Sequence, residues 1–219
     1  MLDFNTAFRK PFTDYRKLLI GLVISAVSSG IAYAGSLGGP TLVAILSLAS
    51  MLIGLFVSGY YLKTGELSLK NKKLLPEWSN WKELFMKGIF ITVIGVIYSL
   101  PLILLGLIFA GLLLVFKIKL LSIVLIALLL VLALFIVYFL PAGVLWFAKK
   151  QTLSAAFNFK DIFKKAFTKI YLVAWIVSLA YSLLLGLILV IIPVVGTSIA
   201  SFISGLTGIT LLAEAFRKS

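Results

Sequence analysis

The stretch GIFITVIGVIYSLPLILLGLIFAGLLLV, residues 88–115, contains no Asp, Glu, Lys or Arg. A helix that crosses a membrane needs about 20 mostly apolar residues. The whole chain is 62% hydrophobic and 12% charged, whereas soluble domains have about 25% charged residues. Runs of the same kind occur at residues 18–34, 41–62, 120–148, 170–192 and 197–213. We therefore expect an all-α integral membrane protein with about six transmembrane helices.

The two longest runs are separated by FKIKL, residues 116–120. Because Lys117 and Lys119 are charged, we expect an external turn here rather than a flaw in one long buried stretch. The extra length of both runs is accommodated by tilt or a kink.

The basic residues indicate how the chain is oriented. With six spans, eighteen of the 20 Lys and Arg residues fall on the side that holds both termini and the second and fourth loops. Basic residues are enriched on the cytoplasmic side of membrane proteins. We expect a multi-pass protein of the cell membrane with both termini cytoplasmic and a basic face on anionic headgroups. Nucleic-acid binding is disfavoured, because these residues flank spans and no nucleic-acid motif accompanies them.

The first run also resembles a cleavable signal peptide, with a basic start and AYA at residues 32–34. Because this run has a counterpart later in the chain, we expect it to be kept as a span.

One basic phrase occurs twice. DFNTAFRKPFT, residues 3–13, and NFKDIFKKAFT, residues 158–168, are identical at five of eleven positions. Phenylalanines four residues apart form an aromatic stripe on a helix, and both phrases carry such a stripe: Phe4, Phe8, Phe12, Phe159, Phe163 and Phe167. With Lys164 and Lys165 beside the stripe, the pattern is typical of a short amphipathic helix in the headgroup layer. Pro11 predicts a bend or restart in the first copy. The alternative is a loop whose Phe side chains pack on the spans.

A fainter third copy lies at residues 83–88. We expect a single membrane domain, residues 1–219, built from three pseudo-repeats at 2–66, 76–150 and 153–219. Each repeat would consist of a short interfacial helix followed by a transmembrane hairpin, and the three hairpins would lie parallel.

Other recurring residues predict close helix packing, or alternatively a cavity. Serines four residues apart let helices approach closely, and prolines kink spans. The residues concerned are Ser25, Ser29, Tyr98, Pro101, Tyr138, Pro141, Ser178 and Ser182.

The most distinctive stretch is SGYYLKTGELSLKNKKLLPEWSNWKELFMKG, residues 58–88. Asn80 followed by Glu83 predicts a capping box at the start of the next helix. We expect Trp78, Trp81 and Phe85 to anchor this segment at the headgroup level.

This stretch resembles the DUF4013 family of uncharacterised multi-pass membrane proteins, frequent in archaea. The residues that carry the likeness are Gly59, Tyr60, Gly65, Glu66, Leu75, Pro76, Trp78, Trp81, Leu84, Phe85 and Gly88. The later stretch SAAFNFKDIFKKAFTKIYLVAW, residues 154–175, is also similar to that family. The family has acidic residues between the tryptophans where this chain has Ser79 and Asn80. The resemblance implies no activity, catalytic residue or cofactor.

Composition disfavours an enzyme. The chain has no His and no Cys, and its seven carboxylates are scattered along the membrane face, so we expect no catalytic, cofactor-binding or metal site. The favoured function is a non-enzymatic membrane scaffold that binds lipids, a protein partner or a second copy of itself. The alternative is a transporter or channel for a small or lipid-like substrate, with three pseudo-symmetric hairpins. A water-accessible cavity near Tyr98 and Tyr138 would favour the alternative, and a sealed bundle the scaffold.

Overall fold

A computed structural model of the chain describes residues 2–116, 119–193 and 195–219. In this part of the chain the regular structure is helical, and six helices are long and apolar enough to cross a membrane. They are α2 (Tyr15–Ser36), α3 (Pro40–Leu69), α4 (Trp81–Phe116), α5 (Lys119–Lys150), α7 (Lys169–Leu189) and α8 (Val195–Lys218). Each predicted run coincides with one of these helices, although the run at 170–192 continues past the end of α7. The six predicted spans are thus confirmed as helices. The centre of the turn predicted at 116–120, residues 117–118, lies outside the described residues.

Polar side chains cap the N-termini of several of the long helices. The Asp14 carboxylate accepts hydrogen bonds from the backbone N–H groups of Arg16 and Lys17, at 3.1 and 3.2 Å. The Asn80 side chain accepts the Glu83 N–H at 3.2 Å, which is half of the predicted capping box. The Glu83 carboxylate is instead paired with Lys63 and Lys87. Each cap satisfies N–H groups that have no partner within the helix.

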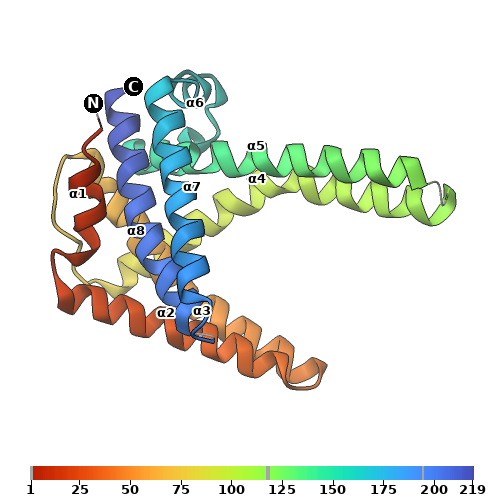
Figure 1. Cartoon of the computed structure of the whole chain (residues 1–219), viewed down its shortest axis with the longest axis horizontal. Helices are drawn as coiled ribbons and strands as arrows, with labels where there is room; N and C mark the ends of the chain where they lie inside the picture. The colour runs from red at the N-terminus through yellow and green to blue at the C-terminus, as the bar shows by residue number, and fades with distance from the viewer. Residues whose placement is uncertain (1, 117–118, 194) are drawn as a thin grey trace.

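The long helices form three hairpins, α2–α3, α4–α5 and α7–α8. Figure 1 shows that the hairpins are not parallel, because the tips of α2–α3, α4–α5 and α7–α8 point in different directions. They meet around α8, which contacts α2, α3 and α5. Lipid chains are as apolar as Leu side chains, so the outer halves of the hairpins have no hydrophobic reason to pack on one another.

Helix α8 is the centre of the fold. In its most apolar stretch 72% of the residues are buried, against 11% for α3, α4, α5 and α7. It packs on α1, α2, α3, α5 and α7. Small buried residues, among them Ser204, Gly208 and Ala213, allow this close approach. The three hairpins are therefore packed around one helix of the third hairpin.

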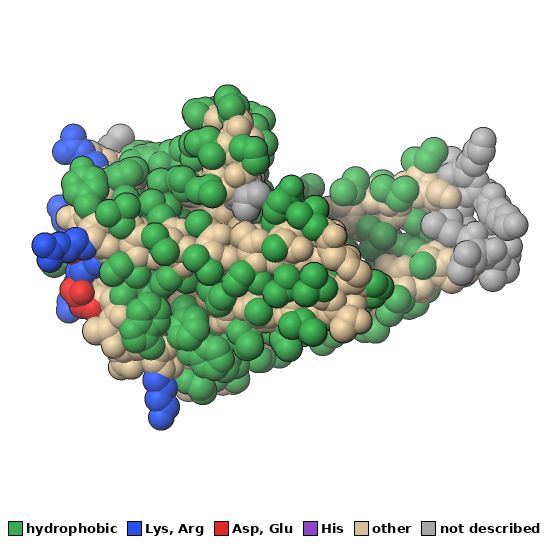
Figure 2. Space-filling view, turned by 90° about the horizontal axis from the view of Figure 1, so that it is seen from below, with side chains coloured by type: hydrophobic (Ala, Val, Ile, Leu, Met, Phe, Trp, Pro, Cys, Tyr) green, Lys and Arg blue, Asp and Glu red, His purple; other side chains and the backbone are tan. Residues whose placement is uncertain are grey.

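The surface separates into an apolar flank and a charged end. Figure 2 shows hydrophobic side chains over the flank, while the Lys, Arg, Asp and Glu side chains on this face gather at one end. Large apolar side chains such as Leu187 of α7, 71% exposed, cover the long helices. Soluble monomers rarely expose such large apolar areas, so the flank needs lipid.

Short helices lie at the charged end. They are α1 (Phe4–Arg9), the 3-10 turns η1 (Lys10–Phe12) and η2 (Leu153–Phe157), and α6 (Phe159–Ala166). The break predicted near Pro11 falls where α1 gives way to η1. The third copy of the basic phrase differs from the prediction. Residues 83–88 are the first turns of α4, and no separate short helix precedes them in residues 70–80. An uninterrupted apolar sequence after Gly88 lets one helix continue.

Candidate functional site

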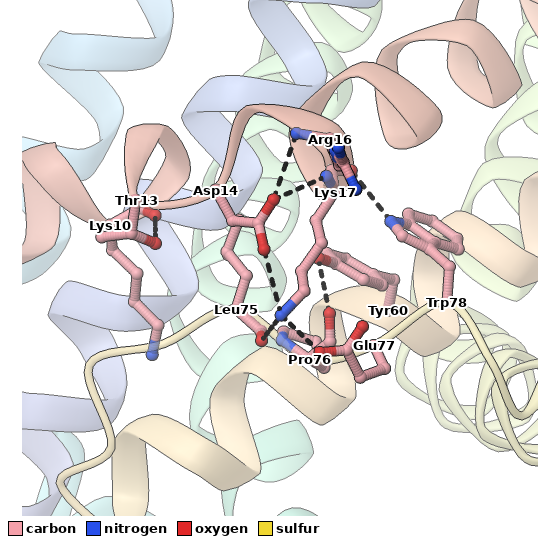
Figure 3. A network of polar contacts seen from close by, with 10 residues as sticks. All are labelled: Lys10, Thr13, Asp14, Arg16, Lys17, Tyr60, Leu75, Pro76, Glu77 and Trp78. Carbon is pink, nitrogen blue, oxygen red and sulfur yellow. Dashed lines mark hydrogen bonds and ion pairs between the residues drawn. The ribbon is translucent and has the colours of Figure 1, made fainter.

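The charged end is built around the segment that joins α3 to α4. Figure 3 shows residues 75–78 of this segment against the start of α2. The Lys17 ammonium lies 2.6 Å from Glu77 and 3.3 Å from Asp14, and it donates to the Leu75 carbonyl at 3.3 Å. Hydrogen bonds, first that from the Lys17 backbone N–H, hold the pKa of Asp14 below its usual value. The joining segment is therefore fastened to α2 by charge and by its own backbone.

Trp78 lies inside this assembly. Its ring stacks on that of Tyr60, with centroids 4.0 Å apart and planes 6° from parallel, and its Nε1 donates to the Lys17 carbonyl at 2.9 Å. The Tyr60 hydroxyl donates to the Pro76 carbonyl at 3.1 Å. Trp78 is only 6% exposed, so its ring packs against the protein at this joint. Trp81 is about half exposed, and Phe85 is half-buried against Phe56.

Two glycines set the crossing of α3 and α4. A Cβ atom on Gly59 would lie 1.8 Å from the Leu84 carbonyl oxygen, and one on Gly88 would lie 2.0 Å from that of Leu55. Real Cβ atoms do not approach backbone so closely. Any side chain here would force the two helices apart.

Ion pairs close the same crossing. Lys63 pairs with Glu83 at 2.8 Å, and Lys87 pairs with Glu83 at 3.2 Å and with Glu66. The Gln151 side chain donates to Glu66 at 2.9 Å, which connects α3 to the end of α5. These carboxylates serve to hold helices together.

The residues of the distinctive stretch thus form one contact between α2, α3 and α4. A profile described as "Protein of unknown function (DUF4013)" matches residues 42–194. The chain belongs to the DUF4013 family. Searches of curated proteins and of solved structures found no match. In this DUF4013 protein the stretch that carries the likeness is a helix-joining element, held by glycines, an aromatic stack and ion pairs.

The two phenylalanine phrases lie partly against the protein and partly on its surface. In α6, Phe159 and Phe167 are exposed, while Phe163 packs on Phe139 of α5 at 4.7 Å. Its buried positions are Ile162 and Ala166. In the first copy, Phe4 and Phe12 are exposed and Phe8 packs edge-on against Tyr181 at 4.8 Å. Each phrase therefore combines one ring that is more buried with two outer, exposed ones, and in α6 the outer rings also touch Tyr98 and Phe139.

The lysines of the phrases differ in their surroundings. Lys164 is exposed, and the Lys165 ammonium lies 5.8 Å from the Phe216 ring centre. Burial lowers the pKa of Lys165, and the neighbouring Lys149 and Lys164 lower it further. Lys10, the counterpart of Lys165 in the first copy, is fully buried.

The tyrosines and prolines have structural contacts. The Tyr98 and Tyr138 hydroxyls donate to the carbonyls of Ala156 and Ala166, at 2.8 and 2.5 Å, and so hold η2 and α6. Pro141 cannot donate to the Val137 carbonyl one turn earlier, and Trp175 Nε1 donates to that carbonyl instead, at 3.3 Å. Pro101 lies inside α4 in the same way. Neighbouring helices commonly satisfy carbonyls freed by a proline.

The serines divide between packing and a hollow. Ser178 lies beside Gly208 of α8, and Ser182 donates to the Ser178 carbonyl. Ser28 and Ser50, which the spacing argument missed, exchange hydrogen bonds of 2.8 and 2.9 Å between α2 and α3. Ser25 and Ser29 line a hollow of about 230 Å³ between α2, α3 and α8. The Ser25 hydroxyl is buried there without a hydrogen-bond partner among the described residues.

Sequence reasoning also missed a cavity around Lys10, between α1, the end of α3 and the end of α8. Its basic residues come from three distant parts of the chain: Lys10, Lys72, Lys73, Arg217 and Lys218. No local spacing connects them, and the repeat of Lys10 as Lys165 was the one available signal.

Proposed function

We propose that this DUF4013 protein is a non-enzymatic scaffold of the cell membrane whose basic end binds anionic lipid headgroups from the cytoplasmic side. The supporting observation is the separation of surfaces, with an apolar flank and a charged end. Eighteen of the 20 basic residues belong to the predicted cytoplasmic side. Such a surface is attracted to anionic leaflets by about 1 kcal/mol for each Lys or Arg near the membrane.

The two phenylalanine phrases supply the second half of this argument. Phe4, Phe12, Phe159 and Phe167 are exposed beside basic residues at the charged end. Burying an exposed Phe in an apolar phase contributes about 1.5–3 kcal/mol. Phe167 is 71% exposed, so most of its apolar area is left to be buried in the membrane, and most of this stabilisation comes from membrane binding.

The carboxylates support a scaffold rather than an enzyme. Asp14, Glu66, Glu77, Glu83 and Glu214 are each ion-paired with a lysine. A general base or nucleophile must be able to reach a substrate, and these groups are engaged in joining helices.

The test is amide hydrogen exchange in nanodiscs of phosphatidylcholine, with or without phosphatidylglycerol. The proposal expects residues 4–12 and 158–168 to exchange more slowly on anionic discs. It expects the difference to disappear near 1 M salt, where screening acts over about 3 Å. Equal exchange on both discs at low salt would overturn the proposal. A protein partner or second copy at the basic end would instead be seen as a stoichiometric companion on purification in mild detergent.

One observation favours transport as the second candidate. The hollow near Ser25 is lined by hydroxyl groups, and the buried Ser25 hydroxyl has no hydrogen-bond partner in the part of the chain that the structure describes. Small molecules bind preferentially in hollows between helices that a few polar groups line. Uptake of small neutral solutes into proteoliposomes tests this candidate, with Ser25→Leu as the blocking variant and Ser182→Leu as the control. Uptake that Ser25→Leu alone abolishes would replace the scaffold by a transporter.

A further inference from the structure

The cavity around Lys10, called the Lys10 cavity here, lies where the chain begins and ends. Figure 1 shows α1 beside α8, with the two termini close together. The Asp3 backbone N–H donates to Glu214 at 2.9 Å, which joins the first residues of α1 to α8. The cavity has a volume of about 240 Å³. Pockets for drug-sized ligands measure about 300–1,000 Å³, so this one suits a small group.

Lys10 is buried, and both acceptors that the described residues offer its ammonium are neutral. Its side chain is 1% exposed, and its ammonium donates to the Ser68 hydroxyl at 2.7 Å and to the Lys72 carbonyl at 3.0 Å. An ammonium has three N–H donors, so one remains. Among the described residues no carboxylate lies within ion-pair distance of it. Figure 3 shows the Lys10 side chain apart from the Asp14–Lys17 pair. A buried charge is costly unless it is paired, and the two neutral acceptors leave this one unpaired.

The acids of the cavity are already engaged. Glu214 accepts from Lys218 at 2.5 Å, and Asp3 accepts from the Thr6 N–H and hydroxyl at 3.0 and 2.6 Å. Five basic side chains therefore face two acidic ones, and neither acid reaches Lys10. The cavity has an excess of positive charge that its own residues do not balance.

From this arrangement we propose that the Lys10 cavity binds a phosphate group. The buried Lys10 ammonium would donate a hydrogen bond to a phosphate oxygen, and Arg217, Lys72 and Lys73 would supply further positive charge from the cavity wall. Lys and Arg are the common ligands of phosphate, and hydrogen bonds between charged groups are the strong ones. The phosphate belongs to a phospholipid headgroup or to a free phosphate, and the chemistry is the same for both. The lipid form rests on the proposed function, since it gives the basic end one specific headgroup site.

The experiment uses the full chain, wild type and Lys10→Gln, with Lys160→Gln as the matched control. Lys160 is exposed on α6 and lies outside the cavity. Its replacement by Gln removes one positive charge from the same end of the protein, as Lys10→Gln does. One arm measures phosphatidylglycerol binding by native mass spectrometry of the protein in detergent micelles. The other measures the rise in unfolding temperature with inorganic phosphate, against chloride at equal ionic strength.

We expect Lys10→Gln to weaken binding in at least one arm by roughly 10- to 100-fold, as for the loss of a hydrogen bond between charged groups. Lys160→Gln should stay within about twofold. A loss in the lipid arm alone identifies a headgroup, and a loss in the phosphate arm alone identifies a soluble phosphate. Should Lys10→Gln fail to fold, Arg217→Gln, an exposed change in the cavity wall, replaces it in the same comparison with Lys160→Gln.

Equal losses in the Lys10 and Lys160 variants would overturn the site and leave the proposed function intact, because diffuse surface charge would then suffice. Absence of both phosphatidylglycerol and phosphate binding in the wild type would also overturn the site. A wild type without preference for anionic nanodiscs would overturn the proposed function, while phosphate stabilisation that depends on Lys10 would still support the site.

Discussion

The ring of Trp78 lies flat against that of Tyr60, with centroids 4.0 Å apart. Trp78 belongs to the segment that joins α3 to α4, and Tyr60 belongs to α3. The Tyr60 hydroxyl also donates a hydrogen bond to the Pro76 carbonyl of the joining segment. The stack therefore fixes the joining segment on the end of α3, and the most characteristic tryptophan of the chain is part of the core.

Trp78→Ala should lower the free energy of unfolding by about 3–5 kcal/mol, because truncating a buried aromatic ring leaves a cavity. Trp81→Ala is the matched control, since Trp81 is 45% exposed and should cost less. Unfolding in mixed micelles, followed by circular dichroism, measures both. Similar losses for the two variants would contradict a core role for Trp78.

Gly59→Ala and Gly88→Ala should each destabilise the protein by about 1–3 kcal/mol, the usual range for overpacking. The obstacle at both positions is backbone, which cannot rotate away as a side chain can. Gly95→Ala, also in α4, is the control, because nothing lies within 4 Å of its added methyl group. That change should be neutral or stabilise by up to about 1 kcal/mol, since Ala favours helix more than Gly. The same micelle unfolding measures all three.

Cysteine labelling tests the orientation, since the chain contains no cysteine of its own. Single cysteines at the exposed positions Ser36 and Ile191 should react with an impermeant reagent added outside intact cells. Cysteines at Asn71 and Ser154, exposed at the charged end, should react only after the membrane is opened. Labelling of Asn71 from outside is the result that would reverse the orientation.

The phenylalanines of α6 separate membrane anchoring from protein packing. Phe159→Ser with Phe167→Ser removes the two outward rings and should speed amide exchange of residues 158–168 in nanodiscs, because apolar burial in the headgroup layer is lost. Phe163→Ser removes the more buried ring, 4.7 Å from Phe139, and should speed exchange in detergent more than the outward double variant does. Lys164→Gln with Lys165→Gln should loosen the segment on anionic discs only. If the outward double variant exchanges like wild type, protein contacts alone hold α6.

The Lys10 cavity predicts a pH dependence. Burial lowers the pKa of Lys10 to about 8, so the ammonium loses its proton in the folded protein before it does in the unfolded chain. Without ligand, the unfolded chain binds more protons above pH 8, and stability from this group rises with pH between about 8 and 10.4. Ligand binding has the opposite sign, since it needs the charged form.

Phosphatidylglycerol, whose phosphodiester does not titrate in this range, should therefore bind more weakly at pH 9.5 than at pH 7. The Lys10→Gln variant is the control for the other charged groups that face Lys10. These are Asp3, Lys72, Lys73, Glu214, Arg217 and Lys218. Native mass spectrometry across the range measures the effect, and an equal decline in wild type and Lys10→Gln would exclude Lys10 as its source.

Several features of this chain could be predicted from the sequence because they depend on neighbours along the chain. In lipid every backbone group must be satisfied within its own helix, so an apolar run such as 88–115 predicts a span by its length alone. The capping role of Asn80 and the break near Pro11 are local in the same sense. The family likeness was readable from residues 58–88, since it rests on order and spacing.

Other features depended on which helices cross, and composition does not encode that. Gly59 and Gly88 were visible as part of a family phrase, but only the crossing of α3 and α4 shows why a side chain is excluded at each. Nothing in the sequence indicated that the Trp78 ring stacks on Tyr60 and is buried, because that depends on where the joining segment lies on α3. A lysine next to Arg9 is expected at the surface, but Lys10 is buried, because α1, α3 and α8 converge on it from opposite ends of the chain. Burial is a property of the assembled helices, and so the candidate phosphate site exists only in the tertiary structure.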